Sequence, residues 1–199
     1  MSIGNFVISS DCTWGGNHLK VPATGYAISE GAFQPNDDEY TISIVADIKA
    51  IVTSSNYSQV ILAQGTSVNK SNVKNFCVYL QGRQIKFSYR YGSGSSAVVI
   101  IEAPITVGKH VLDFVVSKTA GRMYIDGALA TEYTRALTKV ITTYKLGIGC
   151  YANDAGFTGN SSQAEFDVYA INLYTRPLTP EEIVSNFEAY NTRYSLGLQ

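Results

Sequence analysis

Polar and apolar residues alternate along most of the chain, in short runs separated by turn-forming residues. In the run 40–51, for example, Ile42, Ile44 and Ile48 fall on one face of an extended chain, and the other face is mostly polar. A period of two residues predicts β-strands with one buried face. The pattern predicts ten strands, at residues 40–51, 58–64, 75–81, 85–91, 97–103, 110–117, 122–125, 129–133, 145–151 and 164–174.

The connections between these runs carry hairpin signals. Asp126-Gly127 is a strong one, because a two-residue type I′ turn needs positive φ at both central positions. Residues 81–84, which contain Gly82, also predict a tight hairpin turn. In the last run the apolar phase slips by one residue near Tyr169 and Ala170, and a β-bulge there would restore a single buried face.

The two ends of the chain differ from this pattern. Residues 1–35 are Gly-rich and lack a clear period, so we expect an irregular segment. Near the C-terminus, Thr179, Pro180 and Glu182 form a capping-box signature that predicts a helix over residues 180–194. Its apolar positions recur at helical spacing, which predicts that the helix lies against the strands. These positions are Ile183, Phe187, Tyr190 and Tyr194.

Together these elements predict an all-β sandwich or barrel closed by one short C-terminal helix. The 199 residues contain no internal repeat and no linker, so we expect one domain over residues 1–199.

Charge and cysteine content narrow the function classes. The formal net charge is −1 and no basic stripe is present, which argues against nucleic acid as a partner. Cys12, Cys77 and Cys150 are odd in number and scattered, unlike a disulfide framework or a zinc cluster, and they fit folding in a reducing compartment. No signal peptide and no apolar run of membrane-spanning length is visible, so we expect no membrane insertion.

Three segments resemble a known family in order along the chain. Residues 107–114, with the His110-Val111 pair, resemble a strand that in the family also carries a Trp, which is absent here. Residues 123–127 resemble the family's Tyr-Val-Asp-Gly hairpin, and residues 173–183 resemble its closing strand and helix. The chain thus resembles a laminin-G-like, concanavalin-A-like lectin/glucanase domain over about residues 40–195. The resemblance implies a two-sheet antiparallel jelly-roll sandwich, a fold that hosts many functions.

The sequence carries part of a glycosidase signature. Some jelly-roll glucanases place two glutamates and an aspartate on one face of a strand, where two carboxyl groups can flank a glycosidic bond. Glu165 and Asp167 fit this spacing, but Tyr169 follows where a second glutamate would stand. His18 and His110 have no acid or nucleophile near them in sequence, and His110 is expected to be packed. We therefore expect that the protein is not an enzyme, and that Glu165 and Asp167 are solvated acids on an outward face.

Candidate sugar-binding residues combine aromatic rings with polar neighbours. The best local cluster is Tyr151, Asn153 and Asp154. The next is Tyr89, Arg90 and Tyr91. The single tryptophan, Trp14, is a further candidate, and the alternative is that it plugs the sandwich or a neighbouring subunit.

Calcium is the one candidate cofactor, because many members of the resembled family bind it through loop oxygens. Asn153, Asp154 and Asn160 lie in one loop and Asp37-Asp38-Glu39 in another, and calcium takes six to eight hard oxygen ligands. The alternative is that these residues serve only as turn formers.

Members of the resembled family with such a closing helix occur in bacterial surface proteins and in bacteriophage tail, fibre and capsid proteins. The leading hypothesis is a non-catalytic phage virion surface or fibre component, made in the host cytoplasm, whose lectin-like domain binds cell-surface glycans or proteins. One alternative is a purely structural capsid or tail decoration knob, with other virion proteins as partners and a homo-oligomer such as a trimer as its assembly. The other is a carbohydrate-binding module or glucanase on the bacterial extracellular surface.

Overall fold

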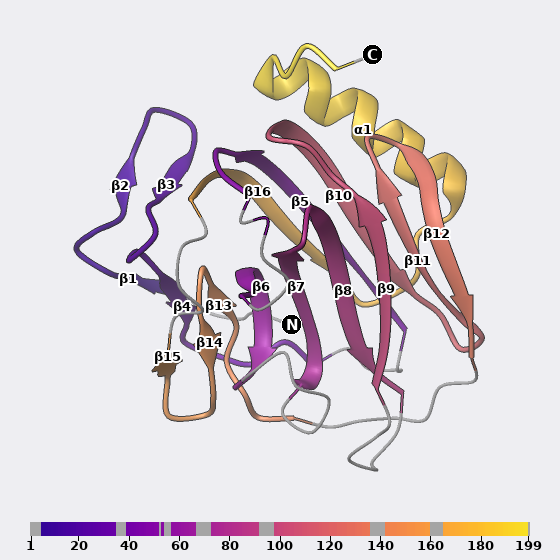
Figure 1. Cartoon of the computed structure of the whole chain (residues 1–199). Coiled ribbons are helices and arrows are strands. Elements are labelled where there is room, and N and C mark those ends of the chain that lie inside the picture. The colour runs from indigo at the N-terminus through magenta and orange to yellow at the C-terminus, as the bar shows by residue number, and fades with distance from the viewer. Residues whose placement is uncertain are drawn as a thin grey trace.

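The computed structural model consists of two antiparallel β-sheets that face each other, with one helix against the outer face of one sheet (Figure 1). It describes residues 5–34, 39–51, 53, 57–66, 73–91, 98–135, 142–159 and 165–198. The predicted fold class, a two-sheet sandwich with one short C-terminal helix, is confirmed. Among the described residues, no helix combines the length and apolar content needed to cross a bilayer.

The first sheet has the strand order β1-β4-β13-β6-β7-β8-β9, and the β14–β15 hairpin extends it beside β6. Its strands are β1 (Phe6–Ile8), β4 (Ala27–Ser29), β6 (Gln59–Gly65), β7 (Val73–Gln81), β8 (Gln84–Arg90), β9 (Val98–Pro104), β13 (Gly147–Ile148), β14 (Tyr151–Ala152) and β15 (Phe157–Gly159).

The second sheet has the strand order β12-β11-β10-β5-β16-β3-β2. Its strands are β2 (Thr13–Trp14), β3 (Leu19–Val21), β5 (Tyr40–Ile48), β10 (Gly108–Val116), β11 (Ala120–Ile125), β12 (Ala128–Thr134) and β16 (Phe166–Tyr174).

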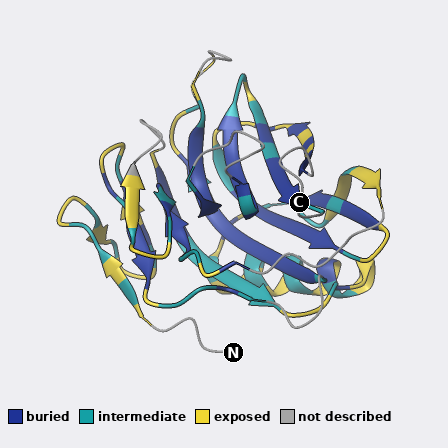
Figure 2. Ribbon diagram, turned by 90° about the horizontal axis from the view of Figure 1, so that it is seen from below, coloured by how far each residue is buried: buried dark blue, intermediate teal, exposed yellow. Residues whose placement is uncertain are grey.

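The main core lies between the two sheets and holds the apolar positions that the alternation predicted. Ile42 and Ile44 of β5 and Phe114 of β10 meet Phe76 and Phe87 from the opposite sheet, all of them fully buried. Figure 2 shows buried residues concentrated in the central strands and exposed residues at the turns. Burying this much apolar surface is the main stabilising contribution to the sandwich.

The predicted turns and the predicted bulge are confirmed. Asp126 and Gly127 have φ values of 51° and 80°, as a type I′ turn requires, and Gly82 and Arg83 have 62° and 66°. The register of β16 against β5 shifts between Val168 and Ala170, which leaves one extra residue on β16.

Two details of the strand prediction differ in the structure. Within residues 5–34, four short strands were not predicted, and they supply β1 and β4 to one sheet and β2 and β3 to the other. Each of these strands is two or three residues long, which is too short for a periodic signal. The expected strand at 145–151 is split into β13 and β14, since Gly149 between them has a φ of 69°.

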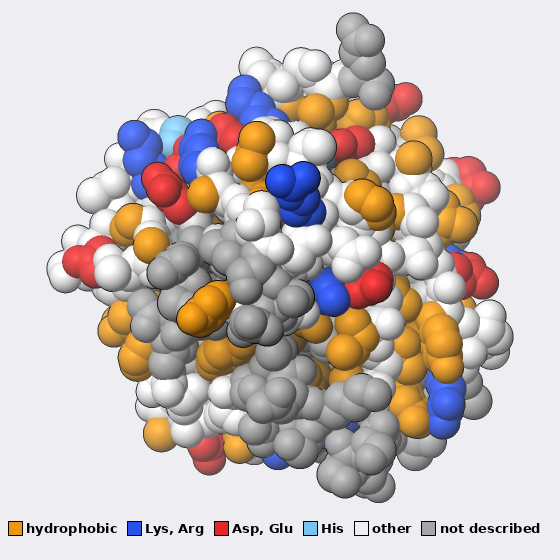
Figure 3. Space-filling model, in the orientation of Figure 1, with side chains coloured by type: hydrophobic (Ala, Val, Ile, Leu, Met, Phe, Trp, Pro, Cys, Tyr) orange, Lys and Arg blue, Asp and Glu red, His pale blue; other side chains and the backbone are white. Residues whose placement is uncertain are grey.

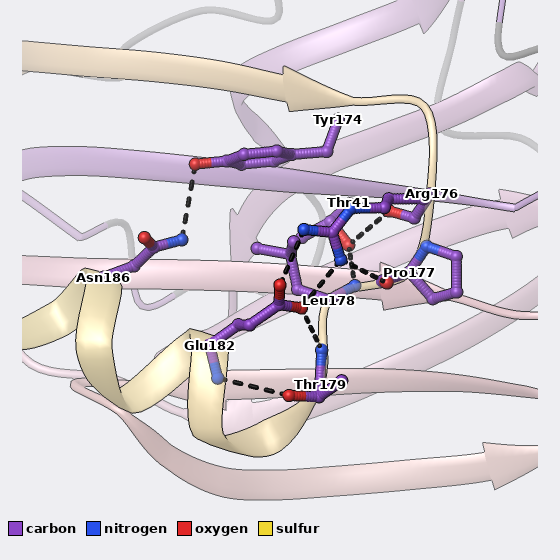
Figure 4. A network of polar contacts seen from close by, with 8 residues as sticks. All are labelled: Thr41, Tyr174, Arg176, Pro177, Leu178, Thr179, Glu182 and Asn186. Atoms are coloured by element: carbon purple, nitrogen blue, oxygen red, sulfur yellow. Dashed lines mark hydrogen bonds and ion pairs between the residues drawn. The ribbon is translucent and has the colours of Figure 1, made fainter.

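The closing helix, α1 (Pro180–Tyr194), has the predicted bounds and the predicted cap. The Thr179 hydroxyl accepts a hydrogen bond from the Glu182 amide, and the Glu182 carboxylate accepts one from the Thr179 amide (Figure 4). Arg176 donates two hydrogen bonds to the same carboxylate, at 2.7 and 2.6 Å, and holds the pKa of Glu182 down at about 2. These contacts fix the angle at which the chain enters the helix.

One face of α1 packs on the outer face of the second sheet. Ile183 is fully buried beside Val115 and Tyr124, and Phe187, Tyr190 and Tyr194 are partly buried in the next cluster along the helix. The predicted apolar stripe therefore makes the contact. The helix covers parts of β5, β10, β11 and β16, and among the described residues neither of its two packing clusters includes a residue of β2 or β3.

Candidate functional site

The residues predicted to form the best sugar-binding cluster lie on the β14–β15 hairpin. Tyr151 is half-buried and packs with Cys77 and Tyr79 on the outer face of the first sheet. The Asn153 side-chain oxygen accepts hydrogen bonds from the Ala155 and Gly156 amides, at 2.9 and 3.0 Å, so it shapes the hairpin turn. Asp154 is exposed, and its carboxylate accepts a hydrogen bond from the Ala155 amide at 3.1 Å. In this hairpin the polar pair performs a turn-forming role.

Two further candidates are unsuited to ligand binding. Tyr89 is fully buried and stacks on Phe87 with ring centroids 5.3 Å apart, so its ring has no face open to a ligand. Burial raises the pKa of its hydroxyl to about 12. Tyr91 packs against the core, and the Arg135 guanidinium lies 4.1 Å from its ring centroid. Arg90 donates a hydrogen bond to the Val73 carbonyl. Because residues 85–91 alternate, the aromatic face of this strand points into the sandwich.

The candidate calcium ligands lie only partly within the described residues. Asn160, Asp37 and Asp38 fall outside them. Glu39 accepts a hydrogen bond from the Lys118 amide at 2.9 Å and so holds a loop in place. Within the described ranges, no group of three or more His, Cys, Asp or Glu side chains is arranged to hold a metal ion. A calcium site therefore stays a prediction.

Trp14 lies on the short edge strand β2 and is 70% exposed. It pairs with Leu19 of β3, which faces the core, while the neighbouring Thr13 pairs with Lys20 on the opposite, outward face. Trp14 is therefore an exposed ring at the rim of the sandwich, on the core-facing side of the β2–β3 ribbon.

The outward face beside this ribbon holds a cleft of about 430 Å³. Register places its residues side by side across the sheet, since Thr13 pairs with Lys20, Lys20 with Asp167, and Asp167 with Asp47. Figure 3 shows basic, acidic and histidine side chains gathered over the region of β2 and β3, at the upper left. The cleft is lined by Asp11, Thr13, Lys20, Val21, Pro22, Lys49, Glu165 and Asp167. We call it the charged cleft.

Ion pairs organise the floor of the charged cleft. The Lys49 ammonium lies 2.5 Å from an Asp47 oxygen and 3.1 Å from an Asp167 oxygen, and these carboxylates raise the pKa of Lys49. His18 Nε2 lies 3.6 Å from Asp167, and its ring packs on Tyr169 with centroids 5.0 Å apart. The charged cleft thus presents fixed charges of both signs close together.

Gly15 allows the ribbon to lie over these side chains. A Cβ atom at this position would come within 2.5 Å of His18 Nε2 and 2.6 Å of Lys20 Cε, closer than van der Waals contact permits. A side chain at residue 15 would therefore push these groups away from the cleft.

Sequence reasoning found only part of the charged cleft. Glu165 is exposed as expected, but Asp167 is only 9% exposed and is ion-paired rather than solvated. Asp11 and Lys20 were missed because β2 and β3 are too short to give a periodic pattern. Lys49 follows the regular strand β5, but the pattern of that strand does not show which distant residues lie beside it. The one local signal for this region is the apolar-charged-apolar order of Leu19, Lys20 and Val21, which in the structure are buried, exposed and buried. His110 is packed as expected, and its Nδ1 lies 2.9 Å from an Asp126 oxygen, which anchors the β11–β12 turn.

Comparison with solved structures finds the same fold in receptor-binding domains of botulinum neurotoxins. The type D domain superposes with a TM-score of 0.72 at 12% identity, over 95% of this chain and 48% of that chain. The type G domain gives 0.68 at 12% identity, over 93% and 46%. Neurotoxin type C, whose cell entry depends on interaction with two ganglioside molecules, gives 0.71 at 12% identity over the same shares. This chain spans about half the length of these domains, and at such identity the likeness shows the fold alone.

No curated protein sequence matches the chain. Residues 20–184 match the sequence profile of a family described as the concanavalin A-like lectin/glucanases superfamily. This match covers most of the chain, with the core strands and the start of the closing helix. It includes Lys20, Lys49, Glu165 and Asp167 of the charged cleft, but it begins after Asp11 and Thr13. The chain therefore belongs to the concanavalin A-like lectin/glucanase superfamily, as the resemblance of its closing segments predicted.

Proposed function

We propose that this chain is a non-catalytic, lectin-like binding domain that takes a glycan of a cell surface into the charged cleft. The observation that carries the proposal is the interleaving of hydrogen-bond donors and acceptors in one open recess. Two ammonium groups, three carboxylates and the Thr13 hydroxyl line it. Sugar hydroxyls both donate and accept hydrogen bonds, so they match such a mixed surface, and charged partners strengthen each bond.

The near balance of charge in the charged cleft favours a neutral glycan. Lys20 and Lys49 face Asp11, Glu165 and Asp167, so neither a strongly anionic nor a strongly cationic ligand is complemented. The relation to neurotoxin domains, one of which belongs to a toxin that interacts with gangliosides, supports glycans as the ligand class.

The same residues argue against hydrolysis. A glycosidase keeps one carboxyl group protonated and the other ionised, and different surroundings produce that difference. Glu165 is exposed to water, and Asp167 is ion-paired with Lys49, so the site provides no apolar setting for an acid catalyst. We expect purified protein to leave soluble β-glucans intact, and release of reducing ends would overturn this part of the proposal.

We also propose a virion surface or fibre as the setting of the domain. The three cysteines are unpaired, and Cys77 and Cys150 are buried, which fits a chain that folds in a reducing host cytoplasm before assembly. Detection of this chain by mass spectrometry in purified phage particles tests the setting. Its recovery only from bacterial envelopes would favour the alternative setting.

The binding proposal is tested on a broad glycan array, with and without a chelator. The full chain is compared with Lys20→Ala and Glu165→Gln, which change exposed side chains of the charged cleft. Glu102→Gln makes the same chemical change at an exposed site on the other sheet and serves as the matched control. We expect a reproducible hit that both cleft variants lose and the control retains.

The other outcomes are equally informative. A blank array would favour the purely structural role, with other virion proteins as partners. A hit that both cleft variants keep but Tyr151→Ala loses would move the site to the β14–β15 hairpin. Loss of the hit with chelator alone would place calcium in the binding mechanism.

A further inference from the structure

β16 has a free edge over its second half. On the side away from β5 it pairs with β3, but only over Phe166–Val168. Beyond the bulge at Tyr169, β16 continues to Tyr174 beside β5, and among the described residues no strand lies on its other side. A sheet edge with unpaired backbone groups is a ready template for another strand.

The register identifies which backbone groups are free. The Lys49 amide donates to the Glu165 carbonyl, so the odd-numbered residues of β5 direct their backbone groups toward β16. Past the bulge, Val45, Ser43 and Thr41 therefore bond to Ala170, Asn172 and Tyr174. The N–H and C=O groups of Ile171 and Leu173 point to the open side, where the described residues offer them no partner.

A recess of about 490 Å³ accompanies this edge. Its lining runs along residues 171–176 of the edge and includes Phe33, which is buried beneath it. Ile171 and Leu173 direct their side chains toward the core, while Asn172 faces outward and donates to the Tyr190 hydroxyl of α1 at 2.8 Å. The recess is therefore apolar on its inner side and polar on its outer side.

We propose that this free edge binds an extended segment of a partner protein, which adds a strand to the second sheet antiparallel to β16. The segment has alternating apolar and polar residues, with the apolar ones over Phe33, Ile171 and Leu173. It would continue the row of β3, which is itself antiparallel to β16 and whose pairing with β16 ends at Val168. The six residues from Tyr169 to Tyr174 span about 20 Å, which suits a short extended segment. The recessed position favours a single strand over the edge of a second folded copy.

The antiparallel arrangement makes a sharp prediction for a peptide probe. Residues directly opposite each other in an antiparallel pair share a face, so the guest residues that bond to Ile171 and Leu173 are its inward, apolar ones. We use the acetylated and amidated peptide KTVTVTVTK as the probe. N-methylation of its valines should weaken binding by about tenfold or more, because two or three backbone hydrogen bonds are lost. N-methylation of its threonines is the matched control and should change the affinity by less than about threefold, because those amides face away from β16.

The full chain is followed by ¹H–¹⁵N NMR during titration with each peptide. We expect saturable shifts at the Ile171 and Leu173 amides with the plain and the threonine-methylated peptide. Equal binding of both methylated peptides, equal shifts at the exposed edge strand β12, or no shifts at these two amides would overturn the proposal. Shifts that depend on protein concentration in the absence of peptide would instead indicate that the free edge binds a second copy of this chain.

The result is independent of the glycan proposal. The charged cleft lies before the bulge on the outer face, and the free edge lies after it. The Glu165→Gln variant should therefore bind the peptide as the unchanged chain does, whatever the glycan array shows.

Discussion

Asp113 of β10 is a buried acid whose carboxylate is only partly satisfied. It lies on the outer face of the second sheet, beneath α1, where Ser43 donates a hydrogen bond to one carboxylate oxygen. The other oxygen has no hydrogen-bond partner among the described residues. Burial, and to a lesser degree the nearby Asp126, raises the pKa of Asp113 from 3.8 to about 7. A buried carboxyl group with one orphan oxygen favours its neutral form.

This shift predicts how stability depends on pH. Because the pKa of Asp113 is higher in the folded state, the folded protein holds a proton that the unfolded chain releases, and the free energy of unfolding falls as pH rises from about 4 to about 7. Asp113→Asn should abolish that fall, which amounts to on the order of 2–4 kcal/mol. Urea unfolding at pH 4.5, 6 and 8 measures it.

Glu188→Gln is the control for this measurement, because Glu188 is an exposed acid on the helix that covers Asp113. Its stability should follow that of the unchanged protein at every pH. Parallel curves for Asp113→Asn and the unchanged protein would show that Asp113 is ionised in the folded state.

Gly121 of β11 makes room for the buried ring of Tyr89. A Cβ atom at residue 121 would lie 2.3 Å from the Tyr89 hydroxyl oxygen and 2.4 Å from the ring carbon that bears it. Gly121→Ala should therefore destabilise the fold by about 1–3 kcal/mol through overpacking, although alanine normally suits a strand better than glycine. In the Tyr89→Leu background the loss should largely disappear. Additive effects in this double-mutant cycle, measured by urea unfolding, would contradict the contact.

Single residues were the hardest scale to predict from the sequence. The alternation placed Tyr89 on the apolar face with Ile85 and Phe87, and that face is the core. Tyr89 was chosen as a sugar-binding candidate for its sequence neighbours Arg90 and Tyr91, and the face on which it lies was not considered. The charged cleft brings Lys20, Lys49 and Asp167 together from segments far apart in the chain, and local patterns contain no information about such contacts. By contrast, the capping roles of Thr179 and Glu182 depend on two residues only three positions apart, so the local sequence motif was sufficient to predict these roles.

At the scale of elements, the junction between β16 and α1 joins a bulged strand to a capped helix. The capping box satisfies the amides of Thr179 and Glu182 at the start of the helix, and Arg176 binds the Glu182 carboxylate. The Thr41 hydroxyl ties the junction to β5, since it donates to the Arg176 carbonyl and accepts from the Leu178 amide. The helix therefore starts from a fixed point on the sheet.

The cap predicts a measurable loss. Thr179→Ala removes the side-chain acceptor for the Glu182 amide and should lower the free energy of unfolding by about 1 kcal/mol. Ser185→Ala, at an exposed position inside the same helix, should cause no loss. Thermal and urea unfolding of the two variants provide the comparison, and an equal effect of both would mean that the cap contributes nothing to stability.

Elements were predictable where they are long and regular. Strands of six residues or more, two hairpin turns, the bulge and the helix all followed from period and turn chemistry. Four N-terminal strands escaped, since two or three residues cannot display a period, and β3 and β4 join the two sheets through partners more than a hundred residues away. The split between β13 and β14 depends on the backbone conformation of Gly149, and the pattern of apolar residues carries no information about that conformation.

At the scale of the whole molecule, the reactivity of the buried cysteine thiols measures how often the fold opens. Burial raises the pKa of Cys150 to about 12 and raises that of Cys77 still further, so neither supplies the reactive thiolate. We expect iodoacetamide at pH 8 to modify these two residues only on unfolding, and the half-buried Cys12 faster. Mass spectrometry of timed samples, with a urea-unfolded control, measures this. Rapid modification of Cys77 in the folded protein would contradict the closed packing of the first sheet.

The pairing of the N-terminal strands also has a consequence for synthesis on the ribosome. β4 pairs with β13, and β3 pairs with β16, so β3 and β4 find these partners only after residues 147–168 have been translated. Until then this side of both sheets stays open, with its apolar faces exposed to water. Such distant pairing slows folding, because the sandwich closes on this side only once residues 147–168 have left the exit tunnel. Between the translation of β4 and that of β13 and β16, the nascent chain must therefore avoid aggregation without the contacts that later close it.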